Sequence, residues 1–101
     1  MEKPTITIDG KKHEMLKLTG RSWRLLGEFV ETAPDYADAD FIEKHAAFIA
    51  QFYPGVTAED ILDLPLENIL PASAAIRKYI MDCLTVKLEK IEKNVETDKA
   101  Q

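Results

Sequence analysis

The chain has 101 residues, of which 46% are hydrophobic and 31% are charged. This length predicts a single domain over residues 1–101, and this composition excludes an intrinsically disordered chain. No apolar run approaches 18 residues and the first residues form no apolar signal region, so we expect neither a membrane span nor export. Cys83 is the only cysteine, which excludes an intrachain disulfide and favours a reducing cytoplasm.

The formal net charge of −5 is concentrated in the middle of the chain. Residues 28–67 carry ten acidic side chains and one basic side chain, whereas residues 1–27 and 68–101 are slightly basic. A nucleic-acid partner would require a basic face that displaces counterions from phosphate, so we expect none. The acidic middle has two interpretations: it solvates helix surfaces, or it attracts a basic partner.

A β-hairpin is predicted over residues 5–18. Alternating β-branched residues form the first strand, Thr5–Ile8, and Asp9–Gly10 is a strong signal for a tight turn. The return strand is expected over residues 13–18. With a two-residue turn, its apolar side chains would lie on the opposite face from those of the first strand. A longer loop, a bulge or partial cover of both faces would each resolve this conflict, and the sequence leaves the three open.

Helical spacing of apolar residues continues through the rest of the chain. It predicts helices over about residues 21–32, 39–52, 57–63 and 71–93, followed by a polar tail over residues 94–101. The fold class is therefore α+β: an N-terminal β-hairpin followed by three to four helices packed on a long C-terminal helix.

Caps and breakers set the limits of the first two helices. Thr19 is the expected N-cap of the first helix, with Ser22 as a local alternative, and Pro34 ends that helix. Trp23 is expected to anchor the core. Asp38 and Asp40 stand at the start of the second helix, where negative charge offsets the helix dipole.

The last two helices have comparable signals. Residues 57–60 read Thr-Ala-Glu-Asp, which resembles a capping box for the third helix, and Pro65 should close that helix. Pro71 suits the first turn of the long helix, so residues 64–70 are expected to be an apolar connector. An apolar stripe then predicts the buried face of the long helix: Ile76, Ile80, Cys83, Leu84, Leu88 and Ile91.

No pattern of catalytic, metal-ligating or cofactor-binding residues is present in the sequence. His45 has no histidine or cysteine three or four residues after it, so we expect a packed or edge-exposed histidine and no metal site. Cys83 is expected to be a small buried apolar group. Aspartate pairs at helix starts are explained by capping, and the scattered glycines form no phosphate loop. The protein is therefore not expected to be an enzyme or to bind a cofactor.

The order of these segments resembles the small tail assembly chaperones of long-tailed bacteriophages. The resemblance covers roughly residues 4–93. It rests mainly on the strand–Asp-Gly-Lys–strand opening, ITIDGKKHEMLKL, and on the segment TAEDILDL before the long helix. Neither segment is a catalytic signature.

Membership of that family would imply a viral protein, from a phage or a prophage, that binds the tape measure protein. It would keep this client soluble in the host cytoplasm during tail assembly and be absent from the mature virion. The major tail protein as a second partner and a homo-oligomer are left open. Two other interpretations remain: a minor structural protein of the phage tail or head–tail junction, and a small helical regulatory protein.

The family offers no fixed binding motif, so the contact residues are predicted from this sequence alone. Apolar side chains cover a wide face of the second helix, enough for a core and a groove together. From the helical angle we expect Ile42, Ile49 and Phe52 to face the core. The candidate client-binding residues are Phe41, Phe48, Tyr53, Asp38 and Asp60.

Overall fold

The computed structural model describes residues 2–32 and 34–100, with side chains described as far as Thr85. It has the predicted α+β architecture, an antiparallel hairpin followed by four helices. The elements are β1 (Thr5–Ile8), β2 (Lys11–Glu14), α1 (Gly20–Glu31), α2 (Phe41–Ala50), α3 (Ala58–Leu62) and α4 (Leu66–Ala100).

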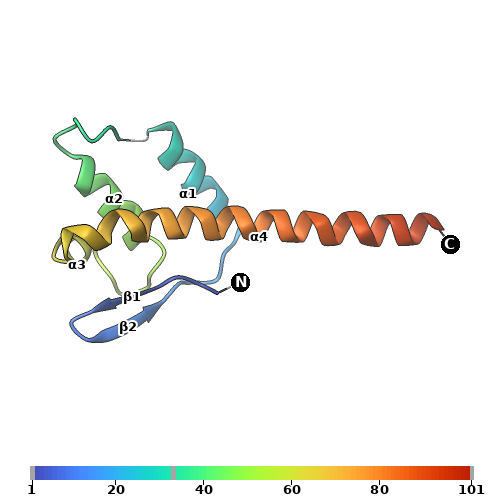
Figure 1. Cartoon of the computed structure of the whole chain (residues 1–101), viewed down its shortest axis with the longest axis horizontal. Helices are drawn as coiled ribbons and strands as arrows, with labels where there is room; N and C mark the ends of the chain where they lie inside the picture. The colour runs from blue at the N-terminus through green and yellow to red at the C-terminus, as the bar shows by residue number, and fades with distance from the viewer. Residues whose placement is uncertain (1, 33, 101) are drawn as a thin grey trace.

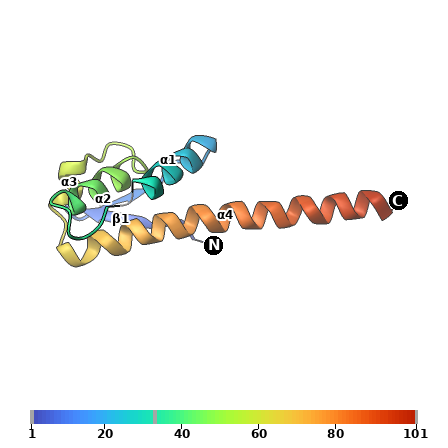
Figure 2. The same cartoon turned by 90° about the horizontal axis from the view of Figure 1, so that it is seen from above.

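The long helix α4 is the axis of the molecule. In Figure 1, α1 and α2 lie on one side of α4 and the hairpin lies on the other. Figures 1 and 2 both show these elements gathered along the N-terminal half of α4, with its C-terminal half extending past them. The Cα extents are accordingly unequal, at 56 × 31 × 20 Å.

The hairpin has the two-residue turn that its sequence indicates. Asp9 and Gly10 both have positive φ, at 51° and 78°, as a type I′ turn requires. The resulting register pairs Ile6 with His13. Strand pairing ends at Glu14, so the return strand is shorter than predicted.

The chain then leaves the hairpin and contacts the turn that follows α2. Met15 is buried, and the backbone N–H of Leu16 donates to the carbonyl oxygen of Phe52 at 2.9 Å. This departure answers the register question left open by the sequence, because the apolar residues after Glu14 are no longer part of the ladder.

Helix α1 is capped by both residues that the sequence singled out. The Thr19 hydroxyl oxygen accepts from the backbone N–H of Arg21, and the Ser22 hydroxyl oxygen accepts from the backbone N–H of Thr19. The prediction that Trp23 anchors the core is wrong, since 46% of its surface is exposed. The inward stripe instead contains Ser22, Leu26 and the half-buried Phe29, and Trp23 lies about 100° from Ser22 around the helix.

The third helix begins with the predicted capping box. The Thr57 backbone N–H donates to the Asp60 carboxylate at 3.0 Å, and the Asp60 backbone N–H donates to the Thr57 hydroxyl oxygen at 3.2 Å. Each group thus satisfies a backbone donor that the first helical turn leaves free.

Helix α4 begins five residues earlier than predicted, at Leu66 and not at Pro71. The first turn is favoured by burial: Ile69 is 1% exposed and lies on one stripe with Ser73, Ile76 and Ile80. This burial offsets the hydrogen bond that Pro71, now inside the helix, cannot donate. The helical backbone also continues to Ala100, past the predicted end, because no glycine or proline follows Pro71.

The core lies where α1, α2, α3 and the hairpin meet the first half of α4. Ile6, Leu26, Ile49, Ile61 and Ile76 bring one buried side chain from each of these elements. On the predicted stripe of α4, Ile76 and Ile80 are buried but Leu84 is 41% exposed. The side chains of Leu88 and Ile91 lie outside the described part of the chain.

Candidate functional site

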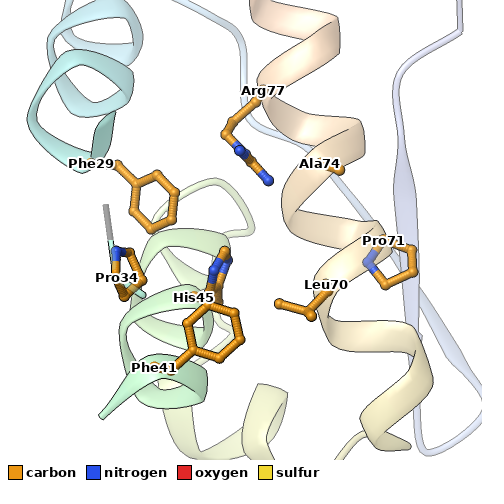
Figure 3. A pocket seen from close by; sticks show the side chains of 8 residues that line it. All are labelled: Phe29, Pro34, Phe41, His45, Leu70, Pro71, Ala74 and Arg77. Carbon is orange, nitrogen blue, oxygen red and sulfur yellow. The ribbon is translucent and has the colours of Figure 1, made fainter. Parts of the chain in front are cut away.

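An open groove lies between α1, α2 and the first half of α4, and we call it the α1–α2–α4 groove (Figure 3). Its volume is about 490 Å³. It is lined by Phe29, Pro34, Phe41, His45, Leu70, Pro71, Ala74 and Arg77. Seven of these eight side chains carry no charge at pH 7. Six are apolar, and the seventh is His45, whose pKa is lowered by burial.

Aromatic rings in contact with one another form one wall of the groove and continue into the core. Positions 41, 45 and 48 of α2, and position 52 in the turn that follows it, keep helical spacing and place four rings in one column. Ring centroids are 4.8 Å apart for Phe41 and His45, and 5.1 Å apart for Phe48 and Phe52. Phe29 of α1 joins the column by stacking on Phe48 at 4.3 Å. The wall of the groove is therefore continuous with the core and is held rigidly by it.

His45 fixes the distance between α2 and α4. Its Nδ1 lies 2.8 Å from the hydroxyl oxygen of Ser73, and both residues are buried. Burial lowers the pKa of His45 below its ordinary value of 6.5, and the nearby Arg77 charge lowers this pKa further. The imidazole is therefore neutral at pH 7 and links α2 to α4 through Ser73. His45 is thus a packed histidine, one of the two possibilities expected from the sequence.

Arg77 is the one charged side chain among the residues that line the groove. Its Nε donates to the backbone carbonyl oxygen of Ser73 at 3.3 Å, and its Cζ lies 5.7 Å from the centroid of the Phe29 ring. Figure 3 shows the guanidinium directed from α4 toward Phe29 and His45. Among the side chains described, the ion pair within 4 Å is that of Lys44 and Asp40, so no carboxylate pairs with Arg77 at that distance.

The structure places the predicted aromatic contact residues in different environments. Phe41 is half-buried and lines the groove. Phe48 and Tyr53 are 2% and 1% exposed, so the prediction that they lie on the groove side is wrong. Phe48 is covered by Phe29 of α1, a neighbour that the helical angle of α2 alone does not reveal.

Tyr53 lies past the end of α2, so the helical angle does not give its direction. It is buried there and connects the N-terminal segment to the core. Its hydroxyl donates to the Pro4 carbonyl oxygen at 2.9 Å, and burial raises its pKa to about 12. Ile49 and Phe52 are fully buried, as predicted for the core, whereas Ile42 is only half-buried.

The two predicted acidic contacts, Asp38 and Asp60, make local hydrogen bonds, in a turn and in a helix cap, and do not line the groove. The Asp38 carboxylate accepts from the backbone N–H of Asp35 at 2.9 Å, and Asp60 completes the capping box at Thr57. The groove residues of α4 were not predicted from the sequence. Leu70, Ala74 and Arg77 stand at i, i+4 and i+7, a spacing that could have identified them as one face.

A second, smaller groove of about 270 Å³ runs between α1 and α4. Cys83 lines it and is half-buried, so it is more exposed than the buried apolar group expected from the sequence. Trp23 and Leu84 line the same groove and are 46% and 41% exposed. Within residues 2–32 and 34–85, no group of three or more histidine, cysteine, aspartate or glutamate side chains is placed to hold a metal ion.

Comparisons with protein-family models, with curated proteins and with solved structures gave no match. In the part of the chain that the structure describes, no helix combines the length and the apolar character needed to cross a membrane.

Proposed function

We propose that this protein is a tail assembly chaperone of a long-tailed bacteriophage, with the tape measure protein as its client. The observation that carries the proposal is the open α1–α2–α4 groove, an apolar surface on a chain with a net charge of −5. The resemblance of residues 4–93 to that family supplies the identity of the client. In this proposal the protein binds its client and catalyses no reaction.

The groove suits a helical client for a physical reason. Its lining comes from helices and from Pro34, so it offers apolar side chains and no strand edge for main-chain pairing. A tape measure protein is a long helical chain with apolar stripes that remain exposed until the tail subunits surround it. An apolar groove can cover part of such a stripe, and the net charge of −5 favours a soluble complex.

The proposal extends to where the protein acts. We place it in the host cytoplasm, in contact with the tape measure protein before assembly, and outside the finished virion. A minor structural protein of the tail or head–tail junction is the competing proposal. Mass spectrometry of purified virions separates the two, because a structural protein stays in the particle and a chaperone does not.

The direct test is co-expression with the tape measure protein encoded by the same phage genome. Leu70 lines the groove, whereas Leu66 is 68% exposed on the same helix and does not line it. We expect Leu70→Gln to reduce the soluble client several-fold and Leu66→Gln to leave it unchanged, because only the first change places a polar amide in the groove.

Circular dichroism of both variants controls for folding, since both replace an exposed leucine by glutamine in one helix. Equal loss of soluble client in the two variants, or no dependence of client solubility on the wild-type protein, would contradict the proposal. The long open reading frame of a tape measure protein should also lie downstream of the gene.

A further inference from the structure

We propose that the α1–α2–α4 groove selects an amphipathic helix that carries an aspartate or glutamate side chain beside its apolar stripe, with Arg77 as the residue that reads this carboxylate. The inference rests on the proposed function, in which the groove holds a helical client, and it names the class of segment that is held. The juxtaposition that carries it is a guanidinium, with no carboxylate within 4 Å among the described side chains, inside an otherwise uncharged, aromatic groove.

Two contacts restrain the Arg77 side chain in an orientation that can bind a ligand. The Nε hydrogen bond to the Ser73 carbonyl oxygen anchors one edge of the guanidinium, and Phe29 lies near its Cζ at 5.7 Å. These contacts restrain the side chain while the two Nη groups keep donors for an incoming group. A carboxylate is the partner that matches this fork, since arginine binds planar anions through parallel charge-assisted hydrogen bonds.

The surroundings of Arg77 strengthen such a pair. The other lining residues are apolar, apart from a neutral His45, so a bound helix would exclude water from the guanidinium. A charge pair gains strength when water is removed, and a buried guanidinium without a partner is unfavourable. An apolar helix without a carboxylate would therefore cover Arg77 at a penalty, and this penalty creates the selectivity.

Within the described residues 2–32 and 34–100, no segment of this chain covers the groove, so we take the occupant to be a helix of another chain. Leu70 and Arg77 are seven residues apart on α4, which gives the groove about two helical turns of length. Figures 1 and 2 show α4 running away from the groove toward the C-terminus, so this helix does not fold back over its own groove. An exposed Ala74 and a 38% exposed Leu70 leave the groove accessible.

The test uses three designed helical peptides of about 20 residues with amidated C-termini, long enough for helix formation. They share one leucine and phenylalanine stripe and differ by Glu, Gln or Lys at the flanking positions. Binding to the full chain is measured by fluorescence anisotropy. We expect the Glu peptide to bind at least about tenfold more tightly than the Gln peptide, and the Lys peptide to bind most weakly.

Variants of the protein assign this preference to Arg77. Arg77→Gln should abolish the preference for Glu over Gln, and Arg77→Glu should reverse the order in favour of Lys. Lys78→Glu is the matched control, because Lys78 is exposed on the same helix and does not line this groove. It makes the same charge change and should keep the wild-type order, and thermal unfolding confirms that each variant is folded.

Equal binding of the three peptides to the wild-type protein would overturn the inference, as would absence of binding or a preference that survives Arg77→Gln. Its failure is separable from that of the proposed function. Dependence of the tape measure protein on Leu70 without any Glu preference would retain the chaperone and reject the role of Arg77. A Glu preference in a protein that does not hold the tape measure protein would retain the groove selectivity and reject the client.

Discussion

The column of aromatic rings along α2 and the turn that follows it has a closed end and an open end. At the closed end, Phe48 and Phe52 are 2% and 0% exposed and form part of the core. At the open end, Phe41 is half-buried and lines the α1–α2–α4 groove. The same residue type on one face of one helix therefore has two roles. The neighbours decide the role: Phe29 covers Phe48, whereas the structure leaves one side of Phe41 facing the groove.

The largest effect that separates the two ends is on stability. Phe48→Ala should lower the free energy of unfolding by about 3–5 kcal/mol, because it leaves a cavity between Phe29 and Phe52. Phe41→Ala should lower it by less than half as much, since this ring is already partly in solvent. Urea unfolding followed by circular dichroism measures both values. Equal losses would show that the two ends are packed alike and that the comparison is wrong.

Features of the fold that depend on local signals could be predicted from the sequence, whereas features that depend on tertiary packing could not. The hairpin and the α3 capping box were predicted because their signals are local: Asp9–Gly10 sets its own backbone conformation, and Thr57 reaches Asp60 within one turn. The start of α4 was not predicted correctly, because local chemistry favours Pro71 as a first-turn residue. The burial of Ile69 against other elements outweighs that preference, and this burial is a tertiary effect.

The groove was predicted only in part. Phe41 was identified from the width of the apolar face of α2, but Phe48 and Tyr53 were assigned to the wrong side. A helical angle gives the direction of a side chain and does not say which element covers it. Arg77 was missed because a charged residue next to a buried stripe normally points into solvent. Its place in the groove depends on its contact with the Phe29 ring of α1 and on its hydrogen bond to the backbone carbonyl oxygen of Ser73.

A smaller effect tests how the closed end holds the hairpin. Tyr53→Phe removes the hydrogen bond from the hydroxyl to the Pro4 carbonyl oxygen while keeping the buried ring. We expect a loss of about 1 kcal/mol in the free energy of unfolding, the usual net value of one such bond. Tyr36→Phe is the control, because Tyr36 is 85% exposed and should change stability very little. Faster amide exchange at Ile6 in Tyr53→Phe alone would place the loss in β1, whereas unchanged stability would show that the bond does not anchor the hairpin.

The smallest expected effect is the pH dependence that His45 gives to stability; this residue stands between Phe41 and Phe48 in the column. The folded state holds the pKa of His45 below its ordinary value of 6.5, mainly through burial and further through the charge of Arg77. Between the two pKa values the unfolded chain binds more protons than the folded chain, so protonation favours unfolding. The contribution of His45 to stability is therefore complete above pH 6.5, decreases as the pH falls through 6.5, and levels off below the folded pKa. His45→Gln should flatten this part of the stability curve between pH 7.5 and about pH 5. A His45→Gln curve parallel to that of the wild type would show that the imidazole titrates freely and that the link between His45 and Ser73 opens at no cost to the fold.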